Sequence, residues 1–412
     1  LPGGDGFLGV CFGDVITANS PKTERPTNWQ ALLWHEFCHV VTLNLTQNKM
    51  PRWLSEGISV YEELQQNPAW GQQMTPEYRR MILDGELTPI GNLSGAFLNP
   101  PSPMHLQFAY YESALVVEFI VEKYGFASLK AILTDLAKDV EINMAISKHT
   151  SPMKRLEKEF ETFAQIRARN LAPKADWEQP EKGPLDPMDH EALTGWLTKH
   201  PNNFQALTLY AKALITDRQW EQAKEILDKL IELYPQYTGD DNAYQLLAEV
   251  HRYLGETEQE QQVLDQLAAK SADAIHVYGR LLEIAVEEEN WQDVVKYGQK
   301  YMAVYPLLTQ LYRQLGLARE ALGRDEEAIE SYRRLLLLEP PDPVDVNYRL
   351  GRLLQHSDPA EAKRHVLMAL AEAPRFRQAH RLLLKIVNNA QESSESISNN
   401  PSDLPINQEG TQ

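Results

Sequence analysis

The stretch that decides the fold of the N-terminal half is His35-Glu36-Phe37-Cys38-His39. This H-E-x-x-H pattern lies inside a run from Trp29 to Leu45 that predicts one helix. Residues four positions apart lie on the same face of a helix, so His35 and His39 can offer their imidazoles to a single metal ion. Glu36 lies beside them, where its carboxylate can take a proton from a water molecule.

The second decisive block is Pro51-Arg52-Trp53-Leu54-Ser55-Glu56-Gly57-Ile58-Ser59-Val60-Tyr61-Glu62-Glu63, which predicts a helix with proline near its start. The first helix has room to end, and the chain to turn at Asn48-Lys49-Met50 and return. We therefore expect Glu56 to be a third metal ligand. Zinc suits two imidazoles and a carboxylate, with a fourth position left open in catalytic sites. Ser59 and Glu63 either orient these ligands or face solvent, and the sequence leaves both alternatives open.

Two other zinc arrangements are disfavoured by the residues around the motif. The longer pattern H-E-x-x-H-x-x-G-x-x-H is not met, because Thr42 stands in place of the glycine and Leu45 in place of the third histidine. Cys38 precedes His39 directly and points about 100° away from the ligand face. We expect Cys38 to be a packed thiol rather than a ligand.

Together the two blocks resemble the gluzincin metallopeptidases. W-L-S-E-G-I-S is similar to W-L-N-E-G-F-A of aminopeptidase N-like enzymes, and the spacing is closer to bacterial peptidase MA-like families that carry helical repeats. The resemblance covers residues 7 to 170 and implies an α+β zincin-like metallopeptidase domain that binds one zinc ion. It implies His35, His39 and Glu56 as zinc ligands and Glu36 as general base. The exopeptidase motif G-x-M-E-N of the aminopeptidases has no counterpart here.

A third segment, Ala109-Tyr110-Tyr111-Glu112-Ser113-Ala114-Leu115-Val116-Val117-Glu118-Phe119-Ile120, resembles a later helix of this family that begins with a tyrosine. In related enzymes that tyrosine donates a hydrogen bond to the oxyanion of the tetrahedral intermediate. Alignment with the repeat-bearing families favours Tyr110, and alignment with Y-E-K-G of the aminopeptidases favours Tyr111. The alternative is that both tyrosines are ordinary packing residues at a helix start.

Upstream of the motif, Phe7 to Thr17 alternates imperfectly between apolar and polar residues and predicts one or two short strands. In gluzincins a strand edge beside the metal pairs with the substrate backbone. The segment is equally compatible with a buried strand of a small sheet.

Composition limits the classes of partner. The formal net charge of −18 argues against a nucleic-acid-binding surface, which needs basic patches. No apolar run has transmembrane length, since Leu335 to Leu338 is far too short. The 2 cysteines, Cys11 and Cys38, make no disulfide framework. Residue Leu1 is not a methionine, so we expect the metallopeptidase-like domain to be N-terminally incomplete, and the family resemblance favours an extracytoplasmic location such as the bacterial periplasm.

The chain changes character after Asn170. We expect a metallopeptidase-like domain over residues 1–170 and a proline-containing linker over 171–190. A helical repeat domain is expected over 191–390. A disordered tail over 391–412 is predicted by its polar composition, which lacks aromatic residues.

The second half repeats itself. Pro306, Pro340 and Pro374 recur at the spacing of about 34 residues typical of tetratricopeptide repeats. Small residues such as Gly316 and Ala328 let the two helices of a unit approach closely. We expect an all-α tetratricopeptide solenoid, closed by a capping helix. The expected units begin near Phe204, Asp241, Ile275, Thr309 and Pro343, and the unit from Asp241 is degenerate because Glu260 stands where a small residue is expected.

The predicted function is zinc-dependent hydrolysis of peptide bonds, with a peptide or protein as substrate. The concave groove of the solenoid is expected to bind the substrate or a partner protein, although it could also be only a rigid arm or a dimer surface. The alternative function is a scaffold or assembly factor whose zinc site is structural or vestigial. Glu36 counts against that alternative, because a structural site needs no base.

Overall fold

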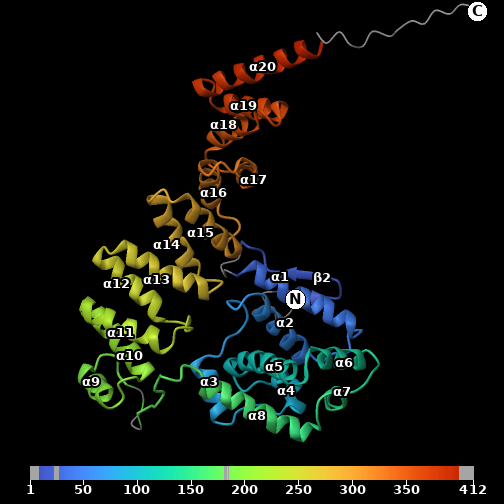
Figure 1. Cartoon of the computed structure of the whole chain (residues 1–412), viewed down its shortest axis with the longest axis vertical. Coiled ribbons are helices and arrows are strands. Elements are labelled where there is room, and N and C mark those ends of the chain that lie inside the picture. Colours follow the sequence, from blue (N-terminus) through green and yellow to red (C-terminus); the bar gives the residue numbers. More distant parts are fainter. Residues whose placement is uncertain (1–8, 23–26, 181–182, 184, 399–412) are drawn as a thin grey trace, which may run out of the picture. The chain divides into compact units, whose positions relative to one another are not determined.

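A computed structural model of the chain describes residues 9–22, 27–180, 183 and 185–398. The chain, traced in Figure 1, divides into two compact units, residues 1–284 with 303–305 and residues 285–302 with 306–412. The predicted linker at 171–190 falls inside the first unit, and the predicted domain boundaries stay predictions.

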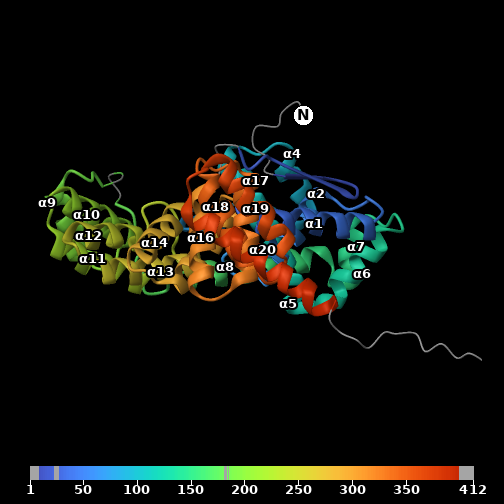
Figure 2. The ribbon, with the colours of Figure 1, turned by 90° about the horizontal axis from the view of Figure 1, so that it is seen from above.

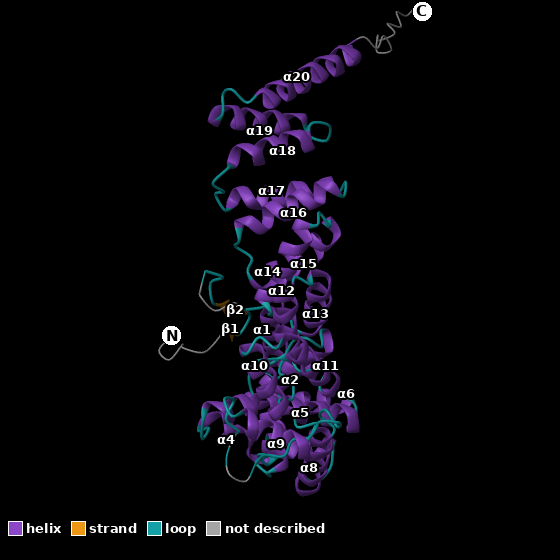
Figure 3. Ribbon diagram, turned by 90° about the vertical axis from the view of Figure 1, so that its left-hand side faces the viewer, coloured by secondary structure: helices purple, strands orange, loops and turns teal. Residues whose placement is uncertain are grey.

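A single β-hairpin opens the described part of the chain. Strands β1 (Gly9–Phe12) and β2 (Val15–Ala18) pair antiparallel, with Gly9 opposite Ala18. Gly13 turns the chain with a φ of +61°, which glycine adopts without steric cost. The short strands predicted upstream of the motif are therefore confirmed within the described residues. No larger sheet occurs in the part that the structure describes (Figure 3), so the expected α+β character rests on this hairpin.

Helices α1 (Trp29–Leu45) and α2 (Arg52–Gln66) are the two helices predicted around the H-E-x-x-H motif. Asn28 caps α1, because its Oδ1 accepts hydrogen bonds from backbone amides of the first turn. Gln47 and Asn48 take left-handed φ angles of 53° and 59° and reverse the chain between the helices. The reversal packs α2 against α1, as the spacing predicts.

Helix α5 (Pro103–Tyr124) is the central helix of the N-terminal half and packs along α2. Gly57 makes this close approach possible, since a Cβ there would lie 2.6 Å from the backbone oxygen of Ser113. The packing fixes the position of Glu56, which precedes that glycine on α2. The core around the two helices is aromatic and aliphatic: Trp53, Leu54, Ile58, Phe108, Leu115, Val116, Val117, Phe119 and Ile120.

Shorter elements complete the N-terminal half. The last of them is α8 (Met153–Arg169). The others are α3 (Pro76–Leu83), the 3-10 helix η1 (Ile90–Asn92), α4 (Leu93–Leu98), α6 (Phe126–Leu136) and α7 (Ile142–His149).

Helical hairpins follow in the first unit, with α10 against α11 and α12 against α13 (Figure 2). These helices are α9 (His190–Lys199), α10 (Phe204–Thr216), α11 (Trp220–Leu233), α12 (Ala243–Leu254), α13 (Thr257–Lys270) and α14 (Ile275–Glu287). Glu260, predicted to be out of place, is 1% exposed. It pairs with Arg252 at 2.7 Å and Arg280 at 2.8 Å, so two guanidinium groups compensate its buried charge.

The second unit continues the same hairpin pattern. Its helices are α15 (Trp291–Val304), α16 (Thr309–Ala321), α17 (Asp325–Leu337), α18 (Pro343–Leu354), α19 (Pro359–Glu372) and α20 (Arg377–Ser398). A Cβ on Gly316 would lie 2.4 Å from the ring of Tyr332, which confirms that a small residue is needed there. The predicted helix starts at Phe204, Ile275, Thr309 and Pro343 are confirmed, and α12 begins two residues after Asp241.

The end of the chain is helical for longer than the sequence predicts. Helix α20 packs on α19, as expected of a capping helix, and runs to Ser398. The remainder of the predicted disordered tail, residues 399–412, lies outside the described residues. In the described part of the chain, no helix combines the length and apolar character needed to cross a membrane.

Candidate metal centre and active site

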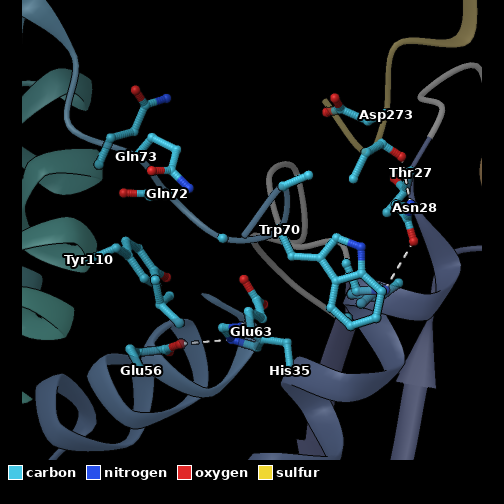
Figure 4. A pocket seen from close by; sticks show the side chains of 18 of the residues that line it. Thr27, Asn28, His35, Glu56, Glu63, Trp70, Gln72, Gln73, Tyr110 and Asp273 are labelled. Carbon is cyan, nitrogen blue, oxygen red and sulfur yellow. Dashed lines mark hydrogen bonds and ion pairs between the residues drawn. The ribbon is translucent and has the colours of Figure 1, made fainter. Parts of the chain in front are cut away.

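Two imidazoles and one carboxylate meet between α1 and α2. The Nε2 atoms of His35 and His39 each lie 3.3 Å from Oε2 of Glu56. The three candidate ligand atoms all lie within 4.8 Å of one another. The contact between Glu56 and His35 is drawn in Figure 4. The spacing of four residues on α1 and the return of α2 thus bring together the three residues that the sequence singled out.

Both histidines are held on their other ring nitrogen by side chains of α2. Oε1 of Glu63 lies 2.6 Å from Nδ1 of His35, and Oγ of Ser55 lies 2.8 Å from Nδ1 of His39. Ser59 donates to the backbone oxygen of His35 at 3.2 Å. Ser59 and Glu63 are buried and contact the histidines, so they orient these rings rather than face solvent.

Arg52 connects the third candidate ligand to the tyrosine of α5. Its Nε donates to Oε1 of Glu56 at 3.3 Å, and its Nη2 donates to the hydroxyl of Tyr110 at 2.7 Å. Its guanidinium group also lies 5.2 Å from the ring centroid of Phe97. The sequence reasoning missed Arg52, although its position one helical turn before Glu56 was a usable signal.

The two candidate tyrosines occupy different surroundings. Tyr110 lines the cavity beside the metal-ligand candidates, with its hydroxyl on Arg52. Tyr111 is buried in the core and stacks on Tyr78 with 5.0 Å between ring centroids. Burial raises the pKa of both hydroxyls, so each keeps its proton at neutral pH. Tyr110 is therefore the one whose hydroxyl can reach a molecule in the cavity, and Tyr111 serves packing.

Glu36 lies on α1 next to the three donors without being one of them. It is 4% exposed, and its Oε2 is buried without a hydrogen-bond partner among the described residues. Strand β1 passes directly against it, since a Cβ on Gly9 would lie 2.6 Å from Oε1. Burial raises the pKa of Glu36, and the nearby imidazoles oppose that rise. A carboxylate beside the donors, with one oxygen free of a hydrogen bond in the described residues, is placed for proton transfer.

Without an ion, the cluster holds a proton. Burial alone would lower the pKa of His35, but hydrogen bonds with Glu56 and Glu63 raise it to about 10. Burial alone would raise the pKa of Glu56, but hydrogen bonds with His35 and His39 hold it far below its usual range. A cation can replace that proton between the same atoms, because metal ligands bind in their deprotonated form.

The two cysteines take no part in the donor group. Cys38 lies on α1, and burial raises the pKa of its thiol to about 12, so it stays protonated. This agrees with a packed thiol. Cys11 lines the cavity from β1, and its thiol donates to the backbone oxygen of Gly13 at 3.2 Å.

A cavity of about 1350 Å³ opens over the donors. Helices α1, α2, α4 and α5 line it together with the loop that carries Trp70, Gln72 and Gln73. Figure 4 shows these residues with Tyr110 and Glu56. Two segments of the helical repeats, residues 234–239 and 270–273, also line the cavity. The sequence reasoning did not identify the loop or the two repeat segments.

A second group of donors lies elsewhere in the first unit. Asp176, Glu178 and His200 bring three possible ligand atoms together. Nδ1 of His200 lies 2.8 Å from Asp176, and the side chain of Glu178 is 66% exposed. These contacts are those of an ordinary surface ion pair, and we assign the group no function.

Two family models match separate parts of the chain. Residues 9–165 match the Peptidase MA superfamily, and residues 201–339 match the bacterial transcriptional activator domain. The second match lies entirely within the helical repeats. No curated protein matches the chain. The first match and the helix hairpins from α10 onward support a fusion of a Peptidase MA superfamily region with tetratricopeptide-like repeats.

Solved structures resemble the chain only at low similarity. YrrB, described as a tetratricopeptide repeat protein with an unusual peptide-binding site, is 17% identical with a TM-score of 0.33 over 46% of this chain and 96% of its own. MamA is 14% identical with a TM-score of 0.28 over 45% of this chain and 97% of its own. The Cut9–Hcn1 tetramer is 12% identical with a TM-score of 0.27 over 89% and 79%. Similarities this low assign no partner or ligand to this chain.

Proposed function

We propose that this chain is a zinc-dependent peptidase that hydrolyses peptide bonds with Glu36 as general base. The observation that carries the proposal is the convergence of His35, His39 and Glu56, with the unpartnered Oε2 of Glu36 beside them. The match of residues 9–165 to the Peptidase MA superfamily supports the same chemistry.

The donor set fits zinc by type and number. His35, His39 and Glu56 would hold the ion through two imidazole nitrogens and one carboxylate oxygen. Among the described residues the group contains no fourth protein donor, which suits a catalytic rather than a structural site. A bound zinc ion would supply Lewis-acid chemistry, making a water molecule acidic near neutral pH and polarising a carbonyl group.

Glu36 moves the proton in this proposal. Its unpartnered Oε2 takes a proton from the attacking water as the water oxygen bonds to the carbonyl carbon. The same carboxyl group then gives the proton to the leaving amine as the carbon–nitrogen bond breaks. Because burial raises the pKa of Glu36, it is well suited to hold the proton between the two steps.

Tyr110 stabilises the oxyanion that develops on the carbonyl oxygen. Its hydroxyl accepts a hydrogen bond from Arg52 at 2.7 Å and keeps its own hydrogen for the substrate. The guanidinium group of Arg52 adds positive charge on the same side, and it also holds Glu56 in place. Donors fixed before the reaction stabilise the transition state without rearranging.

An extended peptide is the substrate that fits this site. Strand β1 passes against Glu36, and Gly9 offers no side chain that would separate them. A peptide that pairs with β1 by strand addition would pass beside the base.

The rival proposal is a scaffold or assembly factor that acts through the helical repeats from α10 onward, with a zinc site that is structural or vestigial. A structural zinc site is closed by four protein ligands. The buried carboxylate of Glu36, outside the donor group, has no role in such a site.

A matched pair of variants tests the peptidase proposal. Glu36→Gln should keep one zinc ion per chain and lower turnover of casein or a peptide library by about 10²–10⁴-fold. Glu62→Gln, a carboxylate of α2 outside the donor group, should keep both zinc and turnover. Equal turnover of wild type and Glu36→Gln at equal zinc content would contradict the role of Glu36. Glu56→Ala should lose zinc by elemental analysis, and unchanged stoichiometry would remove Glu56 from the ligands.

A further inference from the structure

Two segments of the helical repeats reach the cavity that contains the metal-ligand candidates. The first, residues 234–239, runs from the end of α11 into the connection to α12. The second, residues 270–273, runs from the end of α13 into the connection to α14. Together they form the part of the cavity lining that the repeats supply, and we call them the repeat wall.

Hydrogen bonds attach the repeat wall to the N-terminal half. Nδ2 of Asn28 donates to the backbone oxygen of Ala272 at 2.6 Å, while Oδ1 of the same residue caps α1. The hydroxyl of Tyr234 donates to the backbone oxygen of Met74 at 3.0 Å. Asn28 and Tyr234 are buried and both bonds are partly buried, so these contacts hold the wall beside the cavity.

The size of the cavity decides which class of molecule it takes. Its volume of about 1350 Å³ exceeds the roughly 300–1,000 Å³ of typical small-molecule sites. A single amino acid or dipeptide would leave much of it unfilled. A segment of several residues has the size to contact both the donors and the repeat wall, because both line the same cavity.

The chemistry of the lining suits a polypeptide backbone. Amide side chains both donate and accept hydrogen bonds, as a peptide backbone also does. Gln72, Gln73 and Gln107 line the cavity from the N-terminal half, and Gln236 lines it from the repeat wall. Asp273 adds a carboxylate on the repeat wall, and Figure 4 shows it on the other side of the pocket from Tyr110 and Glu56.

We propose that the repeat wall is a substrate-binding surface of the active site, which holds an extended peptide segment several residues away from the bond that is cut. This inference rests on the proposed peptidase function. It assigns the first two repeats a role in catalysis by substrate positioning, because contacts remote from the reacting bond can be used to orient it.

Hydroxamates test this without measuring turnover, because the hydroxamate group binds zinc and the attached peptide probes the cavity. The probes are acetohydroxamate and peptide hydroxamates of two and six residues, one series extended on the amino side and one on the carboxyl side. Their dissociation constants are measured by calorimetry on the zinc-loaded full chain. The test variant combines Gln236→Ala, Thr238→Ala and Asp273→Ala.

In at least one series, the wild type should bind the six-residue probe about tenfold or more tighter than the two-residue probe. The triple variant should lose most of that gain and bind acetohydroxamate as the wild type does. The role of the repeat wall would be overturned if the triple variant kept the full difference in affinity between the six-residue and two-residue probes. It would also be overturned if the wild type showed no such difference in either series. Failure of acetohydroxamate to bind the wild type would instead overturn the proposed function, and the inference that rests on it would fall too.

A control variant carries the same three kinds of substitution at exposed positions of the repeats outside the cavity lining. It combines Asp228→Ala, Thr257→Ala and Gln259→Ala. This control should keep the full gain from the six-residue probe. A loss equal to that of the test variant would show a general effect on the repeats and would overturn the proposal.

Discussion

Replacing Glu63 by alanine removes the carboxylate that holds the outer nitrogen of His35. The contact between Oε1 and Nδ1 is 2.6 Å long, and Glu63 is only 8% exposed. Side chains that orient a metal-binding histidine in this way typically contribute about 10–100-fold to metal affinity. That factor corresponds to about 1.4–2.7 kcal/mol of zinc-binding free energy. Glu63→Gln keeps an acceptor oxygen but loses the charge, so its deficit should be smaller.

The loss of zinc affinity in Glu63→Ala should depend on pH, and this dependence tests the role of Glu63 better than the loss at a single pH. Glu63 also helps raise the pKa of metal-free His35 to about 10, so a proton competes with zinc below that pH. Removing Glu63 weakens this competition, which favours zinc binding by the variant at neutral pH. The two effects oppose each other near pH 7. The full deficit should therefore emerge as the pH rises towards about 10.

Competition with a chromophoric chelator measures the dissociation constant of zinc from pH 7 to pH 10. Glu62→Ala is the matched control, since it removes a carboxylate from the neighbouring position of α2 without touching the donors. The control should follow the wild type throughout. Equal zinc affinity of Glu63→Ala and wild type at pH 10 would refute the claim that Glu63 supports the metal site.

Three further predictions concern the surrounding structure. Burial raises the pKa of Glu112 from 4.5 to about 8, so the folded state holds more protons than the unfolded state between these values and stability falls as the pH rises. Glu112→Gln should flatten that slope in thermal unfolding of the metal-free protein, and an unchanged slope would contradict this reasoning. Gly57→Ala should lower the free energy of unfolding by about 1–3 kcal/mol in urea titrations, because its Cβ would meet the backbone of Ser113; wild-type stability would contradict the packing. Asn28→Asp keeps the oxygen that caps α1 but loses the N–H donor to Ala272. Amide hydrogen exchange should therefore accelerate in residues 271–274 but not in the first turn of α1. Unchanged exchange in residues 271–274 would count against the attachment of the repeat wall.

Most of what the sequence predicted about the site followed from how far apart its residues lie along the chain. A spacing of four positions from His35 to His39 places both imidazoles on one face of a helix, whatever surrounds it. The short turn before α2 makes the chain run back along α1, so Glu56 comes close to the histidines. Its Oε2 lies 3.3 Å from Nε2 of His35 and from Nε2 of His39. The starts of four repeat units were predictable because Pro306, Pro340 and Pro374 recur about every 34 residues.

What the sequence could not predict depends on contacts between distant segments. The bond from Asn28 to Ala272 joins residues 244 positions apart, and no periodicity specifies it. Which of Tyr110 and Tyr111 lines the cavity also depends on tertiary packing, because neighbouring residues on a helix point in different directions. Glu260 broke the small-residue pattern, and only the fold shows that Arg252 and Arg280 compensate it.

Anomalous X-ray diffraction from crystals of the zinc-loaded full chain, recorded on both sides of the zinc absorption edge, tests the central claim most directly. The claim predicts one strong anomalous peak about 2.0–2.2 Å from Nε2 of His35, Nε2 of His39 and a carboxylate oxygen of Glu56. No peak at this position, or a peak only at the surface group around His200, would contradict it.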